Sequence, residues 1–291
     1  MLVSKLIEIR SAFFLHKEFD MYSFDERAEK LKEPLNGIFS LGQLLAAVLG
    51  EPMHIYARVK SKNTGLVLAA GAWVGKTVGV DLTKSRADWI APWKLATVLQ
   101  MSIEAGVLVK SPNPDWEHSC PWNGAVRLLI GDLDIAVICS KWDERHDLLL
   151  ASLLLYHVQF SILQFHHIGI RFPTMEDYAA ANFRLEQKAT PLVRPADDHL
   201  RTYFKLWAWP VGYVEHQFFP NGPHDNARHW DLQAADPLGF LQFIGDALDT
   251  APISWEFEEN SPVGMVKVQP TEEGEVLSVM AREKWTPVED W

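Results

Sequence analysis

The sequence predicts an α+β fold in which antiparallel sheets pack against helices. Runs rich in β-branched and aromatic residues are separated by short turns, as in MHIYARV and GLVLAAGAWV around SKNTG, and such pairs are typical of β-hairpins. Between these hairpins lie longer stretches with helix-capping residues and helical spacing of apolar residues. The mixture of hairpins and helices, without a regular strand-helix alternation, predicts antiparallel rather than parallel sheets.

The first half of the chain is expected to hold three helices. Ser23 and Glu26 form a capping box ahead of a helix that ends near Pro34, and a second helix is predicted from Ser40 to Leu49. Pro92 is expected in the first turn of a third helix that runs to about Glu104.

A second hairpin and a long central helix are predicted after these helices. AVRLLIG and DIAVICS are separated by a short turn and predict a second hairpin, which is apolar enough to be buried on both faces. Asp143 to His167 is expected to be the longest helix. Apolar residues nearly surround it, which indicates a buried central element. Its apolar stretch from Leu148 to Phe165 contains His157, Gln159 and Gln164, whereas a membrane span needs about 20 mostly apolar residues, so we expect a buried core helix rather than a membrane span.

The second half is predicted to contain three further helices and a terminal hairpin. The helices are expected at Thr174 to Lys188, Pro195 to Trp207 and Pro237 to Leu248. Pro210 to Trp230 is rich in Pro, Gly, Asn and His and is interpreted as a long surface loop. The final hairpin joins VGMVKVQ to EVLSVMAR through PTEEG.

Length and composition suggest two lobes in a reducing compartment. We expect an N-terminal α+β lobe at 1–142 and a C-terminal α+β lobe at 143–291, although a single large domain also fits 291 residues. Cys120 and Cys139 are too few for a disulfide framework, and the N-terminus does not resemble a signal peptide. A cytoplasmic location is therefore predicted. Twelve Trp residues imply that some indole rings lie near the surface.

Two motifs resemble catalytic signatures but lack the required context. AGAWVGKT fits a permissive phosphate-loop pattern, yet a strand rather than a helix is expected after it. The pair His146-Asp147 could join His118, His166 and His167 in a metal phosphohydrolase, but a predicted hairpin separates His118 from His146. We therefore predict no catalytic residue and no cofactor.

One histidine-rich segment supports an alternative hypothesis. Imidazoles and a carboxylate occur together in the predicted loop between Pro210 and Trp230, and these are ligands that transition metals accept. The alternative is a metal-dependent hydrolase that uses His216, His224, Asp225 and His229.

The leading hypothesis rests on negative charge at the C-terminal end. The net charge is -11, and the last 38 residues hold nine acidic residues against three basic ones. Such a surface disfavours nucleic acid and favours a basic protein partner. We expect a partner-binding surface made of Trp255, Glu256, Glu258, Glu259, Glu272, Glu273 and Glu275.

The acidity, the many Trp residues and the segment SWEFEE ahead of a hairpin resemble bacterial polymorphic-toxin immunity proteins. That resemblance implies an inhibitor that binds and neutralises one cognate toxin, such as a restriction-endonuclease-like nuclease. The resemblance implies no catalytic residues. The charge and hydropathy of the chain predict no nucleic-acid partner and no membrane partner, and the oligomeric state is left open. A structural or adaptor role in a larger assembly is a further alternative.

Overall fold

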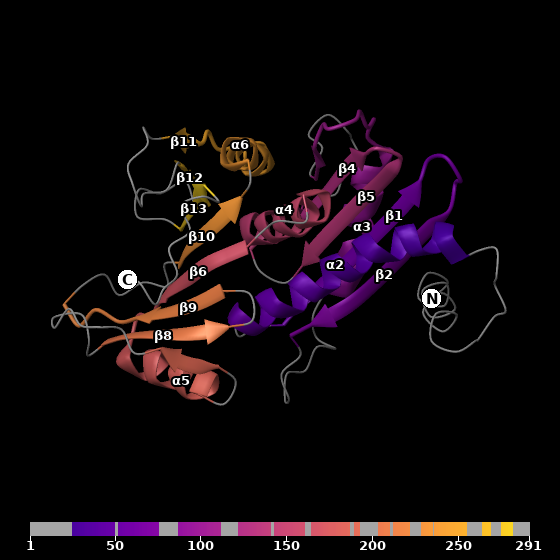
Figure 1. Ribbon diagram of the computed structural model, residues 1–291. Helices are drawn as coiled ribbons and strands as arrows, with labels where there is room; N and C mark the ends of the chain where they lie inside the picture. Colours follow the sequence, from indigo (N-terminus) through magenta and orange to yellow (C-terminus); the bar gives the residue numbers. More distant parts are fainter. Residues whose placement is uncertain are drawn as a thin grey trace.

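The computed structural model shows an α+β fold with two sheets and helices packed between and around them, as predicted (Figure 1). The described residues form five helices and 13 strands. The structure describes residues 25–49, 52–75, 87–111, 122–140, 143–160, 164–186, 189–192, 203–209, 212–221, 228–234, 236–254, 264–268 and 275–281.

The first sheet has five antiparallel strands in the order β2-β1-β5-β4-β3. Side chains alternate along β5, so that Val137 faces the large core with α2 (Asp25–Leu49) and α4 (Glu144–Phe160), whereas Ile138 faces α3 (Ala87–Gln100). Helices therefore cover both faces of this sheet. Its strands are β1 (Met53–Ser61), β2 (Val67–Val74), β3 (Val109–Lys110), β4 (Ala125–Ile130) and β5 (Leu133–Ser140).

Helix α4 lies at the centre of the molecule. All residues from Leu148 to Tyr156 are buried, as expected for a helix that is apolar on nearly every side. It packs against α2 and the first sheet on one side and against α6 on the other. Arg145 in its first turn donates hydrogen bonds to the carbonyl oxygens of Val268, at 2.6 Å, and Leu248, at 3.0 Å. One hydrophobic core therefore includes residues of both halves of the chain.

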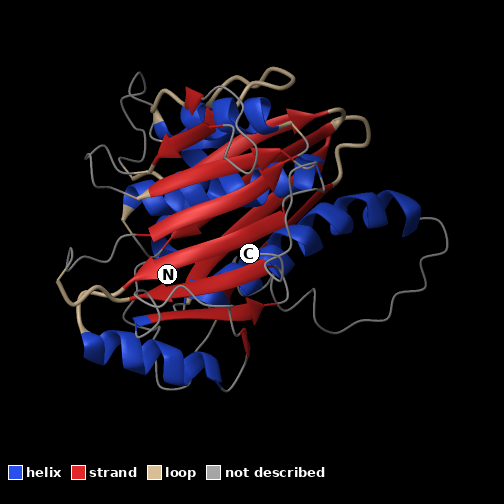
Figure 2. Ribbon diagram, turned by 60° about the vertical axis from the view of Figure 1, so that its left-hand side comes forward, coloured by secondary structure: helices blue, strands red, loops and turns tan. Residues whose placement is uncertain are grey.

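The second sheet has eight strands in the order β11-β12-β13-β10-β6-β9-β8-β7. Its apolar face includes Ile168 and Trp230, which belong to the same core as α4 and α6. Figure 2 looks onto this sheet, and the helices lie behind it and at its margins. The elements are β6 (Gln164–Arg171), α5 (Met175–Glu186), β7 (Thr190–Leu192), β8 (Phe204–Trp209), β9 (Gly212–Gln217), β10 (Arg228–Ala234), α6 (Pro237–Leu248), β11 (Ile253–Ser254), β12 (Gly264–Lys267) and β13 (Val276–Ala281).

The eight-stranded sheet consists of two units with the same topology. Each unit runs strand-helix-strand-strand-strand, first from β6 to β9 and then from β10 to β13. In each unit the last strand pairs parallel with the first, and the other pairings are antiparallel. The units join where β6 pairs antiparallel with β10, so the two first strands lie side by side at the centre of the sheet.

Several predicted elements are confirmed. The hairpins β1–β2 and β4–β5 form as expected, and the terminal hairpin forms between β12 and β13. Helix α6 spans the predicted residues and begins with Asp236, whose carboxylate accepts from the backbone N–H of Gly239. The predicted capping box at Ser23 lies outside the residues that the structure describes.

Several predicted helix boundaries are wrong because tertiary packing overrides local signals. Helix α3 begins at Ala87 and ends at Gln100, so Pro92 lies inside it rather than in its first turn, and it stops short of Glu104. Helix α2 continues through Pro34 as one helix of 25 residues. Leu31, Leu35 and Ile38 keep the helical spacing across the proline and are buried against the first sheet, which offsets the lost hydrogen bond. Helix α4 ends at Phe160, and the remainder of the predicted helix up to His167 belongs to strand β6.

The region between α5 and α6 is also corrected. Residues 204–209 form strand β8 rather than the end of a helix, and the predicted loop from Pro210 to Trp230 contains strand β9 and the start of β10. A half-buried strand is recognised by alternation of apolar and polar residues. Glu215 and His216 are consecutive polar residues that are both buried, so β9 does not show this alternation.

No helix within the described stretches of the chain is long and apolar enough to cross a membrane.

A buried ion pair holds α3 against the start of α4. Lys94 donates to the Asp147 carboxylate at 3.0 Å and to the Cys139 carbonyl oxygen at 3.0 Å, and both charged side chains are almost fully buried. We expect Asp147→Ala to lower the free energy of unfolding by about 3–5 kcal/mol, because it leaves the ammonium group buried and unpaired. Urea denaturation at pH 7 measures this change.

The exposed pair of Lys205 with Glu186, at 3.2 Å, offers a matched control. Glu186→Ala should cost less than about 1 kcal/mol, because solvent screens a pair whose side chains are about half exposed. Equal effects of the two substitutions would contradict the assignment of the Lys94 pair as a buried stabilising contact.

Candidate metal centre

Four potential metal ligands gather on the polar face of the eight-stranded sheet. They come from three adjacent strands: His167 from β6, Glu215 from β9, and His229 and Asp231 from β10. Strand register explains why they meet. His167 pairs with Asp231 across the β6–β10 ladder, and Gly169 pairs with both His229 and Glu215. Since side chains alternate between faces, all four lie on the same face.

Gly169 lets the two units share this cluster. A Cβ atom added to Gly169 would lie 1.8 Å from Cε1 of the His229 ring. The imidazole therefore lies across the backbone of β6, where only glycine leaves room, and reaches toward Glu215 on the far side.

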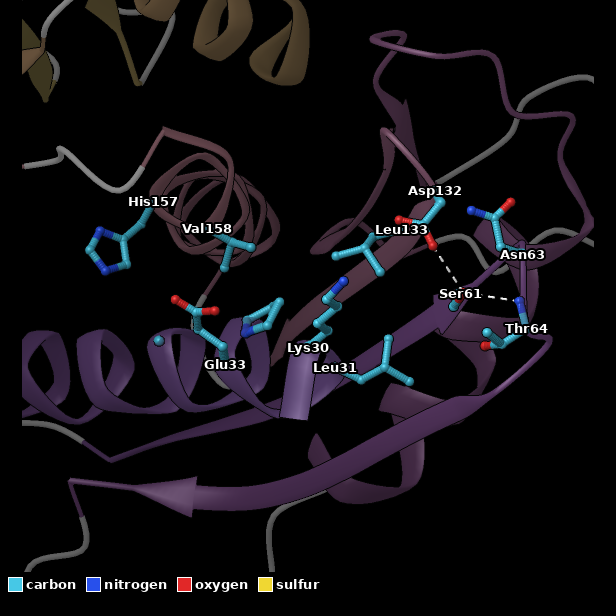
Figure 3. A pocket seen from close by; sticks show the side chains of 12 residues that line it. Lys30, Leu31, Glu33, Ser61, Asn63, Thr64, Asp132, Leu133, His157 and Val158 are labelled. Carbon is cyan, nitrogen blue, oxygen red and sulfur yellow. Dashed lines mark hydrogen bonds between the residues drawn. The ribbon is translucent and has the colours of Figure 1, made fainter. Parts of the chain in front are cut away.

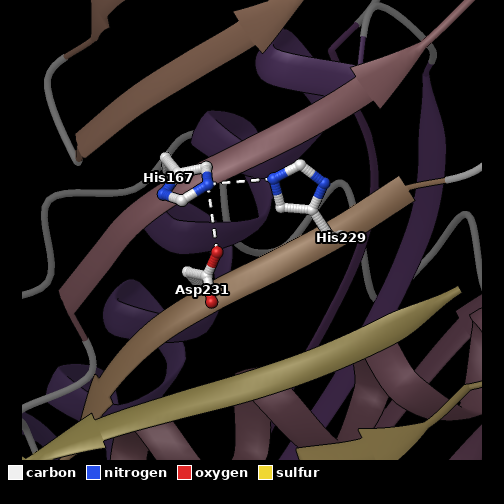
Figure 4. Close-up of side chains that lie close together, drawn as sticks. All are labelled: His167, His229 and Asp231. Atoms are coloured by element: carbon white, nitrogen blue, oxygen red, sulfur yellow. Dashed lines mark hydrogen bonds and ion pairs between the residues drawn. The ribbon is translucent and has the colours of Figure 1, made fainter. Parts of the chain in front are cut away.

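Figure 4 shows the side chains of His167, His229 and Asp231 close together. Nε2 of His167 lies 2.9 Å from Nε2 of His229, 3.0 Å from Oδ2 of Asp231 and 3.3 Å from Oε2 of Glu215. Nε2 of His229 lies 3.5 Å from the same Glu215 oxygen. Ligands about 2.0–2.2 Å from a tetrahedral zinc ion lie roughly 3.3–3.6 Å from one another. The separations of Glu215 from His167 and His229 fall in this range, and those of His167 from His229 and Asp231 are shorter. The ligand atoms of His167, His229 and Asp231 all lie within 4.8 Å of one another.

The two units contribute to the cluster in different ways. His167 in β6 and His229 in β10 hold corresponding places about the centre of the β6–β10 ladder. Glu215 lies beside Gly169 on the last strand of the first unit, and the corresponding residue of the second unit is Ser278, beside Asp231. The second unit therefore supplies its carboxylate from its first strand, and Ser278 hydrogen-bonds that carboxylate.

Burial and mutual contacts shift the pKa values of the cluster. Burial tends to raise the carboxyl pKa of Glu215, but the hydrogen bond from His229 and the charges of both histidines lower it below its ordinary value. The Asp231 pKa is lowered in the same way, chiefly through His167. Burial lowers the pKa of His229, yet its contacts with Glu215 and Asp231 raise it overall. Without a metal ion, these groups therefore form an ion-pair network.

The donor set matches a divalent transition metal. Two imidazole nitrogens and two carboxylate oxygens suit Zn²⁺, Fe²⁺ or Mn²⁺. His167 and Glu215 are nearly buried, whereas the His229 side chain is 32 % exposed, which gives access from solvent at one side. Gln217 donates to the other oxygen of Glu215 and orients that carboxylate.

The alternative site predicted from sequence is corrected in part. His229 does belong to the cluster. His216 does not, because it follows Glu215 directly in β9 and therefore points to the opposite face. There it lies 3.0 Å from the Asn182 amide oxygen, and burial lowers its pKa to about 3. His224 and Asp225 lie outside the described residues.

The predicted partner-binding surface is corrected at one position. Glu275 is buried at 6 % exposure, where it hydrogen-bonds His146 and accepts from the indole N–H of Trp230. It is therefore a core residue and unavailable to a partner. The others, Trp255, Glu256, Glu258, Glu259, Glu272 and Glu273, lie outside the residues that the structure describes.

Sequence reasoning missed Glu215 and Asp231 and assigned His167 to a helix. The available signal was a histidine followed two residues later by a small or acidic residue in each of two β-prone segments, His167-Ile-Gly169 and His229-Trp-Asp231. Only the pairing of these segments shows that their side chains meet.

A separate cavity of about 690 Å³ lies between α2, the end of α4 and two hairpin turns (Figure 3). Three of its polar groups bond to one another: the Ser61 hydroxyl donates to Asp132 at 3.0 Å and accepts from the Thr64 backbone N–H at 3.2 Å. These bonds hold the turns together, so the histidine-carboxylate cluster is the stronger functional candidate.

No family model matches the chain, and no curated protein matches it. Among solved structures, a crystal structure of lactoylglutathione lyase from Agrobacterium tumefaciens is similar to part of it, with 13 % identity. The match covers 41 % of this chain and 93 % of the lyase chain, with a TM-score of 0.19. So low a TM-score supports no functional argument, and the function must be argued from the described residues.

Gly169→Ala should disrupt the cluster while leaving the fold intact. The new methyl group would displace the His229 ring from β6 and remove one ligand, so we expect metal affinity to fall by about 10- to 100-fold or more. Isothermal titration with Zn²⁺ measures this loss.

Gly37→Ala in α2 is the matched control. Its nearest neighbour would be a His157 ring carbon at 4.0 Å, so the substitution should leave metal affinity unchanged and favour the helix slightly. Unchanged Zn²⁺ binding by Gly169→Ala would show that the His229 ring is not held as described.

Proposed function

We propose that this protein binds one divalent transition-metal ion through His167, Glu215, His229 and Asp231, and that it is a metal-dependent enzyme. The observation that carries the proposal is that Nε2 of His167 lies 2.9–3.3 Å from a ligand atom of each of the other three residues. The ligand atoms of His167, His229 and Asp231 also lie within 4.8 Å of one another. In the absence of metal, a hydrogen bond joins the two imidazole Nε2 atoms at 2.9 Å. Both atoms can instead donate their lone pairs to a cation, and with the neighbouring carboxylates they supply the ligand types that divalent transition metals accept.

The chemistry follows from the ligands and from access to them. A bound ion would act as a Lewis acid that polarises a substrate oxygen or a water molecule. His229 lies at the solvent side of the cluster, so a substrate can approach there. Ser278 and Gln217 hold the two carboxylates in orientation. The proposed function agrees with the metal-dependent hydrolase suggested as an alternative by the sequence, but it uses a different set of ligands. Hydrolysis is one of the reactions that a Lewis-acid metal ion can promote.

Metal binding should be stoichiometric and dependent on the cluster. We expect one Zn²⁺ per chain and a loss of affinity of at least about 100-fold in Asp231→Asn, measured by isothermal titration and by metal analysis after dialysis. His157→Gln, on α4 away from the cluster, should bind as the wild type does. Retention of full affinity by Asp231→Asn would contradict the proposed ligand set.

The same titration should depend on pH. The raised pKa of His229 means that a proton competes with the metal, so affinity should rise with pH until that pKa is passed and then level off. In the metal-free protein, folding stability depends on His229 in the opposite direction from metal affinity. The contribution of His229 to stability is present below its ordinary pKa of 6.5 and is lost as pH rises through its pKa in the folded protein. The Glu215 and Asp231 contributions are lost only as pH falls through their lowered pKa values.

Toxin neutralisation is a second proposal, and an exposed aromatic cluster favours a protein partner. Trp89 and Trp93 on α3 are 57 % and 55 % exposed, and Trp122 lies 6.3 Å from Trp89 between ring centroids. Exposed indoles often anchor protein interfaces. The proposal predicts one near-stoichiometric partner in affinity capture that Trp93→Ser no longer retains, whereas Phe183→Ser on α5, also exposed, still does. Equal capture by both variants would contradict a role for this cluster.

A further inference from the structure

Basic residues flank the proposed metal centre on the same face of the sheet. Arg171 lies two residues beyond Gly169 in β6, so its side chain emerges on the face of the cluster about 6.6 Å further along the strand. Lys267 of β12 pairs with Val276 of β13, which pairs with His229 of β10. Lys267 is therefore in the same lateral row as His229, about 10 Å away across two strand spacings.

Contacts around Arg171 place it at one end of the site. In the parallel β6–β9 ladder Arg171 pairs with Gln217, which donates to the Glu215 carboxylate. The guanidinium group lies 5.4 Å from the centre of the Phe219 ring, which supports it from one side. It is near enough to His229 for its positive charge to oppose the rise of that pKa.

The charges of this face favour an anionic ligand. A divalent ion and two neutral imidazoles, together with the carboxylates of Glu215 and Asp231, sum to zero. Arg171 adds a positive charge beside this neutral centre, and Lys267 adds another at longer range. An anion near Arg171 would gain charge-assisted hydrogen bonds, and guanidinium matches a carboxylate in geometry.

We propose that this face binds a small carboxylate substrate, with the carboxylate on Arg171 and a second oxygen atom of the substrate on the metal ion. The inference rests on the proposed metal centre and names its substrate class. Gly169 and Arg171 lie about 6.6 Å apart along the strand, which is comparable with the length of a four- or five-carbon acid, the size of substrate included in this proposal.

Succinate binding to the Co²⁺-loaded protein tests the inference. Visible absorption of the cobalt ion reports metal binding and any change among its ligands, and succinamide provides an uncharged probe of the same shape. We expect succinate to alter the spectrum and succinamide to bind at least about tenfold more weakly. Arg171→Leu should weaken succinate binding by about 10- to 100-fold. Arg171→Lys should keep part of the affinity, since it preserves the charge but loses the planar donor pair.

The controls separate this inference from the metal proposal. Titrations at pH 8 limit proton competition at His229, so Arg171→Leu should retain its cobalt spectrum and cobalt affinity. Arg184→Leu on α5, an exposed arginine outside the cluster, should bind succinate as the wild type does. Cobalt binding with equal succinate affinity in wild type and Arg171→Leu, or with no preference over succinamide, overturns the carboxylate inference alone. Absence of cobalt binding to the wild type overturns both.

Discussion

The antiparallel pairing of β6 with β10 is the constraint on which the candidate site depends. It joins two units of equal topology and sets His167 opposite Asp231 and Gly169 opposite His229. A shift of one residue in this ladder would send the ligands of one unit to the apolar face, where Ile168 and Trp230 are buried. The hydrophobic face therefore fixes the register, and the register positions the polar face.

Buried charged groups elsewhere in the structure form ordinary ion pairs, unlike the groups of the cluster. Arg127 forms two hydrogen bonds to Asp134 at 2.7 and 2.9 Å and also donates to the Val98 carbonyl oxygen at the end of α3. Lys94 has one carboxylate and one carbonyl oxygen as partners. These contacts join one cation to its acceptors and hold elements together. The cluster instead gathers one imidazole and two carboxylates around Nε2 of His167, and such a set of ligand types is expected where a further cation binds.

The sequence predicted local structure more successfully than it predicted the site. Hairpins with short turns and helix α6 with its Asp236 cap could be recognised because their signals lie within a few residues of each other. The sequence predicts a loop where β9 and the start of β10 lie, because Glu215 and the histidines interrupt the apolar pattern and find their partners on neighbouring strands. His229 was recognised as a ligand candidate from composition, but its partners depend on pairing across about 60 residues of chain, which periodicity does not reveal.

The division of the ligands between the two units has a structural consequence. His167 and Glu215 come from the first unit, and His229 and Asp231 come from the second, so neither unit holds a complete set. The centre therefore forms only where the two similar units pair through β6 and β10, and an ion bound there would link the two units. Association of the halves and binding of the ion would then be coupled equilibria, in which each strengthens the other by the same free energy.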